Sequence, residues 1–287
     1  MSKLITIIYI LLSQSLIYSM EILKISPSQL PNDIQFEEQD SLSPEREKEL
    51  IDQYKKQLYQ SESYLVPAQV LFALFEKTGN YTPLDILADF FYENSNDMEL
   101  GLALYQQGAK VKSPHCLFKL ARIELSSNNT ENAFDLLRTG ARQFDNYCLC
   151  MLAQKILDGT FKEHHSDAKK YLMISAQQGF AVAISELATY LTDKKYGPPH
   201  YITAYSLLLT IPGDNRAQQQ LRKLEGNKIV QYYLNHQYLE LADVFATGKE
   251  APQNIDLAIS CVRASTLPAK AKKKLIKEIQ ELTSREQ

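Results

Sequence analysis

The stretch YLMISAQQGFAVAISELATYL, residues 171–191, places two short apolar patterns on either side of a single glycine, Gly179. Before the glycine, small and apolar residues recur at the three- and four-residue spacing of one helical face: Ala168, Tyr171, Leu172, Ser175 and Ala176. After it, the spacing returns in Ile184, Leu187, Ala188 and Leu191. Glycine readily adopts the left-handed backbone that often ends a helix. The stretch therefore predicts a helix–turn–helix hairpin in which Ala176 and Ala188 lie where the two helices approach closely.

The same template recurs along the chain at a period in the thirties. Small residues that start each unit, at 68, 101, 133, 168 and 204, are 33, 32, 35 and 36 residues apart. A period of this size with two helices per unit is typical of an α-solenoid. The positions assigned to the template are Ala68, Ala88, Gly101, Ala109, Ala121, Ala133, Ala141, Ala153, Ala168, Ala176, Gly179, Ala188, Ala242 and Gly248. We expect an all-α protein, a right-handed α/α solenoid of five to six helix–turn–helix repeats.

The segment DAKKYLMISAQQGFAVAISELATYL, from Asp167, resembles the Sel1-like repeat, a tetratricopeptide-like family. Its matching residues are Ala168, Tyr171, Ala176, Gln178, Gly179, Ala183, Leu187 and Tyr190. The resemblance covers about residues 65–266, and LADVFATGKEAPQNIDLAIS, from Leu241, fits a later unit. The chain departs from the family pattern in having no tryptophan and in placing Pro212 where an alanine is expected. An irregular hairpin is therefore expected within 204–240.

The ends of the chain differ from the repeats. Lys3 precedes an apolar run of nine residues, Leu4 to Leu12, which is short for a stable span of a ~30 Å hydrocarbon core and is typical of a secretory signal. An uncleaved anchor or a buried helix stays an alternative. We expect a signal sequence at 1–19, a flexible acidic linker at 20–42, a flanking helix at 43–64 with Pro44 as its first residue, the repeat array at 65–266 and a capping helix at 267–287.

The sequence contains none of the usual catalytic or metal-binding motifs. A phosphate-binding glycine loop, G-x-S-x-G and H-E-x-x-H are all missing, and the net charge of −3 does not favour a nucleic-acid surface. His164 and His165 are adjacent in a polar loop, which favours solvated side chains over metal ligands. The four cysteines, Cys116, Cys148, Cys150 and Cys261, lack the regular pairing of disulfide-stapled repeats, so we expect buried thiols. From the missing motifs we expect no enzyme activity and no cofactor or metal.

The segment KKYGPPHYITAY, residues 194–205, is the candidate partner-binding loop. It holds Tyr196, His200 and Tyr201 in a proline-stiffened connection, and aromatic side chains on rigid loops are efficient anchors for partners. The alternative is that Tyr201 packs over the next hairpin.

Three functions remain open from the sequence. The resemblance favours an exported, non-catalytic scaffold in the periplasm or outside the cell, with a role in envelope processes or host interaction. Such a scaffold would bind a protein or peptide on the concave face of the array. The resemblance also implies a first alternative, a luminal adaptor of eukaryotic protein quality control, because Sel1-like repeats occur in such proteins of the endoplasmic reticulum. Asn80 and Asn128 begin sequons that would permit glycans there, although Thr82 is expected to be a helix N-cap. A hydrolase acting on cell-wall or β-lactam substrates is the second. We expect no nucleic-acid partner and no membrane span after signal cleavage.

Overall fold

The computed structural model of the protein describes residues 23–24, 42–61, 63–95 and 97–283. Every regular element within them is a helix, as the sequence predicts, and none of these helices is both long and apolar enough to cross a membrane. The expected signal sequence and most of the expected linker lie outside the described residues. Leu23 is an exception, because it is fully buried in a hydrophobic core. At this residue the expected linker is packed rather than free.

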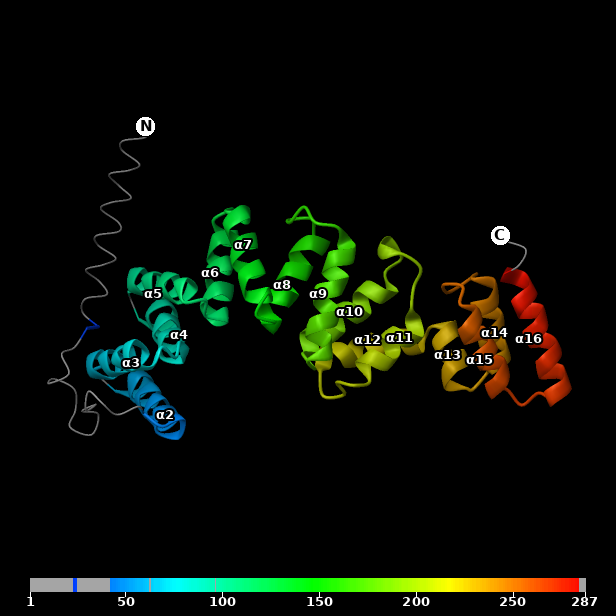
Figure 1. Ribbon diagram of the computed structural model, residues 1–287, viewed down its shortest axis with the longest axis horizontal. Helices are drawn as coiled ribbons and strands as arrows, with labels where there is room; N and C mark the ends of the chain where they lie inside the picture. Colours follow the sequence, from blue (N-terminus) through cyan, green and yellow to red (C-terminus); the bar gives the residue numbers. More distant parts are fainter. Residues whose placement is uncertain (1–22, 25–41, 62, 96, 284–287) are drawn as a thin grey trace, which may run out of the picture. The chain divides into compact units, whose positions relative to one another are not determined.

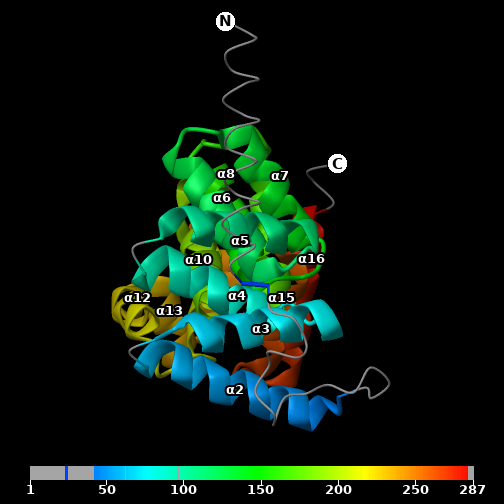
Figure 2. The ribbon, with the colours of Figure 1, turned by 90° about the vertical axis from the view of Figure 1, so that its left-hand side faces the viewer.

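The chain divides into two compact units, residues 1–148 and 149–287, and the boundary falls inside helix α8. In the first unit each helix packs on the next, and Figures 1 and 2 show α2, α3, α4 and α5 stacked one upon another. Its elements are α2 (Pro44–Gln60), α3 (Leu65–Thr78), α4 (Thr82–Asp89), a π-helical turn η3 (Phe90–Asn94), α5 (Met98–Lys110), α6 (Pro114–Ser126), α7 (Thr130–Ala141) and the first residues of α8 (Asn146–Leu157).

The second unit begins with the hairpin that the opening stretch predicts. Its elements after α8 are α9 (His165–Gln177), α10 (Ala181–Thr192), a 3₁₀ turn η4 (Lys194–Tyr196), α11 (Tyr201–Leu208), α12 (Asn215–Glu225), α13 (Lys228–Leu234), α14 (Tyr238–Thr247), α15 (Ile255–Ala264) and α16 (Ala269–Thr283). Helix α10 packs on both α9 and α11, and α15 packs on both α14 and α16. Three short helices, α11 to α13, form the irregular region expected within 204–240. The last helix, α16, buries Ile279 against the core of α14 and α15.

Local hydrogen bonds explain where the first helices begin. The Ser43 hydroxyl accepts a hydrogen bond from the Arg46 backbone N–H at 3.2 Å, which caps α2, and Pro44 is its first residue as expected. At α4 the expected N-cap was wrong by one residue, because the N-cap is Tyr81 and not Thr82. Thr82 is already helical, and the Asn80 side chain accepts from the Thr82 N–H at 2.9 Å. The Asn80 amide also donates to Glu47 at 3.0 Å.

The turns between paired helices confirm the repeat register. Gly79, Lys112, Phe144 and Gly179 all have left-handed backbone, with φ between 59° and 79°. They are 33, 32 and 35 residues apart, the same steps that separate the small residues at 68, 101, 133 and 168. The chain therefore makes the same turn four times, and glycine removes its steric cost in only two of the four.

Burial corrects the role expected for two of the alanines. Ten template positions are buried: Ala68, Ala88, Gly101, Ala121, Ala133, Ala141, Ala153, Ala168, Ala188 and Ala242. Ala109 and Ala176 are only half-buried. The two helices of a hairpin approach most closely one residue before the template alanine. A Cβ added at Gly108 or Gly140 would collide with a cysteine of the following helix. Ser175, at the equivalent position of the next hairpin, is fully buried.

Candidate functional site

An apolar groove lies between α9 and α11, with α10 at its base. It encloses about 400 Å³ and is lined by Lys169, Met173, Ala176 and Gln177 of α9, Leu187 and Leu191 of α10, His200 before α11, and Thr203 and Leu207 of α11. Met173 is 42% exposed, whereas Leu187 and Leu191 are 5% and 8% exposed. The groove therefore has a buried aliphatic base and an exposed thioether on its rim.

Helical spacing brings these side chains together. On α9, Lys169, Met173 and Ala176 are four and then three residues apart, so they share one face. Thr203 and Leu207 share a face of α11 in the same way, and His200 is the N-cap residue that precedes this helix on the same side. A methyl group at Ala176 leaves room that a longer side chain would fill, which explains why this half-buried position is small.

His200 and Lys169 are the two titratable residues among the described residues that line the groove. Its backbone N–H donates to the Leu191 carbonyl at 2.7 Å, which fixes the chain as it enters α11. Burial, helped by the nearby Lys169 ammonium, lowers the pKa of the imidazole below its ordinary value. The lowered pKa favours the uncharged form of the ring, so His200 adds less positive charge to the groove rim than an ordinary histidine would.

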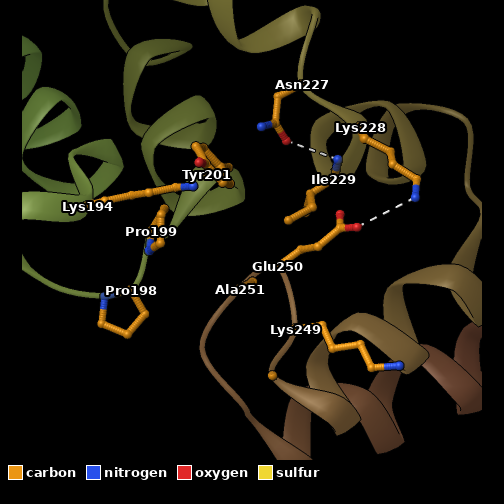
Figure 3. A pocket seen from close by; sticks show the side chains of 11 residues that line it. Lys194, Pro198, Pro199, Tyr201, Asn227, Lys228, Ile229, Lys249, Glu250 and Ala251 are labelled. Atoms are coloured by element: carbon orange, nitrogen blue, oxygen red, sulfur yellow. Dashed lines mark hydrogen bonds and ion pairs between the residues drawn. The ribbon is translucent and has the colours of Figure 1, made fainter.

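A second, basic hollow of about 360 Å³ lies between the start of α11 and the start of α13 (Figure 3). Its lining residues are Lys194, Pro198, Pro199, Tyr201, Asn227, Lys228, Ile229, Gly248, Lys249, Glu250 and Ala251. Figure 3 shows Lys194 beside Tyr201, and Lys228 joined to Glu250 on the other side. The Lys228 ammonium lies 3.6 Å from the Glu250 carboxylate, and both side chains are exposed.

The three residues proposed as partner contacts are placed in three different surroundings. Tyr196 is half-buried and stacks on Tyr190, with ring centroids 4.8 Å apart and planes 9° from parallel. His200 lines the apolar groove. Tyr201 lines the basic hollow and packs partly against the core of α14 and α15, as the alternative interpretation expected. The proline-containing loop therefore separates these side chains instead of presenting one aromatic surface.

The sequence did not reveal the groove residues Met173, Leu187, Leu191 and Leu207. Each occupies an apolar helical position, and the sequence pattern does not distinguish the core from an open groove. The lysines of the basic hollow were missed for another reason. Lys194, Lys228 and Lys249 are distant in sequence and form no charged run.

The described residues contain no group of three or more His, Cys, Asp or Glu side chains placed to hold a metal ion. The four cysteines are free and buried, and burial raises the pKa of their thiols, that of Cys150 to about 12. His164 and His165 bond to different partners, since their Nδ1 atoms lie 2.8 Å from the Ser166 hydroxyl and 2.9 Å from the Tyr190 hydroxyl.

The most connected polar cluster is in the first unit and joins three helices. Asp89 of α4 accepts from the Tyr105 hydroxyl at 2.6 Å, and its carboxylate lies 2.9 Å from His115 Nε2 and 3.3 Å from the Lys119 ammonium. Lys119 also pairs with Glu93 at 2.6 Å. These bonds tie α4 to α5 and α6, so we assign the cluster to helix packing.

Comparison with known proteins identifies the fold. No family model and no curated protein matches the sequence. A solved protective antigen of uropathogenic Escherichia coli strains, described as displaying an SLR fold, superposes with a TM-score of 0.54 over 81% of this chain at 16% identity. The chain has the Sel1-like repeat fold. It spans 56% of the length of that antigen.

Two further solved structures match at lower TM-scores. A Sel1 repeat protein from Oxalobacter formigenes gives 0.48 at 14% identity, with 79% of this chain and 86% of that protein covered. An immunity protein from Pseudomonas aeruginosa gives 0.43 at 19% identity, with 85% and 84% covered. The superposition on the antigen, at a TM-score of 0.54, confirms the Sel1-like fold predicted from the Asp167 segment.

Proposed function

We propose that this protein is a non-catalytic interaction scaffold that binds a peptide segment of a protein partner, with an apolar side chain of that segment seated in the apolar groove. The observation that carries the proposal is the groove itself. It is an open aliphatic surface between successive first helices of a repeat array, the position from which such arrays bind ligands. Met173 on its rim supports a peptide ligand, because an unbranched thioether adapts to different side chains.

Selection of peptides from a random displayed library on the purified protein tests this proposal. Enriched peptides would be synthesised and their dissociation constants measured by calorimetry on the wild type and on variants. Ala176→Leu fills the groove, and we expect it to weaken binding by about five-fold or more, since misfit of this size is worth ~1–3 kcal/mol. Met173→Asp should weaken binding as well.

The matched control is Val182→Leu. Val182 belongs to α10 and is 41% exposed, but it does not line the groove. This change also enlarges an aliphatic side chain on the second unit and should leave the affinity unchanged. Peptides that bind Ala176→Leu as tightly as the wild type would contradict the proposal.

We also propose that the scaffold acts after export, in the periplasm or outside the cell. The support is the sequence pattern of Lys3 followed by the apolar run Leu4–Leu12. Mass spectrometry of the protein from its native cells should find an N-terminus between Leu16 and Glu21. An intact Met1 on protein in the cytosol would contradict it.

A further inference from the structure

The basic hollow and the apolar groove share one wall. His200 and Thr203 line the groove, while Pro199 and Tyr201, which alternate with them, line the hollow. The groove lies between α9 and the face of α11 that carries Thr203 and Leu207. The hollow lies between the start of α11 and the start of α13. One extended ligand that crosses the start of α11 would therefore meet both surfaces.

The hollow carries more positive charge than its own acidic group balances. Lys228 pairs with Glu250, the only carboxylate among the described lining residues. Within the described part of the chain, Lys194 and Lys249 have no carboxylate within 4.0 Å that would form an ion pair. Two lysines of the lining are thus left without a paired carboxylate, and each would attract an anion that enters the hollow.

The walls of the hollow suit a charged group on a chain. Pro198 and Pro199 have fixed backbone φ angles, and they stiffen the segment next to Lys194. Tyr201 is held by its packing against the core, so its half-buried ring is a firm apolar side to a mainly polar hollow. The lysines of the rim have flexible stems, so their ammonium groups can turn towards a bound carboxylate.

We infer that the basic hollow receives a carboxylate of the same partner segment whose apolar side chain occupies the apolar groove. This inference rests on the proposed function and gives the partner a chemistry: an apolar anchor with an acidic residue, or a chain-terminal carboxylate, to one side of it. The apolar contact supplies most of the affinity, and the charge contact fixes the direction in which the segment lies.

The test uses the peptides selected in the experiment above. We expect enriched peptides to carry Asp, Glu or a free C-terminus on one side of the apolar anchor. Lys194→Gln and Lys249→Gln should each weaken their binding about two- to five-fold, the range for a single exposed charge contact, and the double variant should also weaken the dependence of affinity on salt. Lys194→Arg should keep most of the affinity.

Lys195→Gln is the matched control. This neighbouring lysine lies over the Tyr196 ring, 5.2 Å from its centroid, and does not line the hollow. Its removal should change neither the affinity nor the effect of salt beyond a small general loss of positive charge. A peptide in which the acidic residue is replaced by its amide should bind the wild type and the double lysine variant equally well.

Each outcome separates the inference from the proposed function. Peptides that depend on Ala176 but carry no acidic group, and bind the double lysine variant unchanged, would overturn the inference and leave the proposed function standing. Peptides that depend on the lysines but not on Ala176 would overturn the groove and with it the shared ligand. If phosphorylated peptides bind and their carboxylate analogues do not, a phosphate site replaces the carboxylate site.

Discussion

Gly140 lies against Cys148, where α7 meets the start of α8 so closely that a Cβ on residue 140 would collide with the cysteine Sγ. Gly108 and Cys116 repeat the relationship between α5 and α6. In both pairs the glycine is eight residues before the cysteine. The pairs set the spacing of the helices in the first unit and explain why these thiols are buried.

The first prediction concerns this contact. Gly140→Ala should destabilise the protein through overpacking, which typically lowers the free energy of unfolding by about 1–3 kcal/mol. This loss should exceed the ~0.5–1 kcal/mol of stability that alanine gains over glycine inside a helix. In the double variant Gly140→Ala/Cys148→Ala the loss should be smaller than the sum of the single losses, because the Sγ is gone. Chemical denaturation followed by circular dichroism measures each value. Gly213→Ala, at a site with no atom within 4 Å of an added Cβ, is the control. Strict additivity would show that the two residues do not compete for space.

The second prediction separates two alanines of one hairpin. Ala188 is 2% exposed, whereas Ala176 is half-buried and lines the groove. Ala188→Leu should cost about 1–3 kcal/mol of stability, while Ala176→Leu should change stability by less than about 1 kcal/mol and act on binding instead. Thermal and urea denaturation of the two variants compare them directly. Equal destabilisation would place Ala176 in the core and remove the groove.

The third prediction concerns the left-handed turns. Lys112→Gly should stabilise the protein by about 1 kcal/mol, because glycine removes the steric cost of φ at 60°. Gly179→Lys should have the opposite effect at the equivalent turn, where φ is 79°. Both values come from urea denaturation. A loss of stability in Lys112→Gly would argue that the two turns are not equivalent.

The fourth prediction concerns pH and the polar cluster of the first unit. The hydrogen bond to Asp89 outweighs burial and raises the pKa of His115 above its ordinary 6.5, while Asp85 and Lys119 act on the ring in opposite directions. A raised folded-state pKa means that the stabilisation is complete below the unfolded value and is lost as pH rises through the folded value. The free energy of unfolding should therefore fall as pH rises from the unfolded value through the raised folded one, and His115→Gln should flatten this slope.

The same cluster should also lose part of its stabilising effect at low pH, through Asp89. Burial raises the pKa of Asp89, but hydrogen bonds from His115 and Tyr105 outweigh it, and the pKa lies below the ordinary 3.8. This contribution is present above the unfolded value and is lost as pH falls through the lowered one. Urea denaturation at intervals from about pH 2 to pH 9 covers both effects. A His115→Gln variant with the same slope as the wild type at the alkaline end would contradict the assignment.

The sequence predicted the hairpins because helical spacing and a turn glycine act over a few residues. The α9–α10 pair around Gly179 follows from that pattern, as does the start of α2 at Pro44. The error of one residue in the close approach has a similar local cause. Gly108 and Ala109 are both small and adjacent, and the repeat template alone does not say which of them faces the partner helix.

The candidate site needed the structure because it depends on contacts between helices. Met173, Leu191 and Leu207 belong to three helices, and each is an ordinary apolar residue in its own segment. The sequence predicts the loop that holds Tyr196 and Tyr201 as a proline-stiffened connection, but the directions of the two rings depend on Tyr190 and on the core of α14 and α15. Both the groove and the directions of the two tyrosine rings therefore depend on packing partners that are distant in sequence.

The central claim is that a partner segment binds in the groove between α9 and α11, and methionine methyl resonances test it most directly. Met98, Met151 and Met173 are the described methionines, and only Met173 lines the groove, while Met98 is 56% exposed in the first unit. In protein labelled with ¹³C at the methionine methyls, titration with a selected peptide should shift the Met173 resonance, assigned by Met173→Leu, and leave Met98 unchanged. A shift at Met98 with Met173 unmoved would contradict the account.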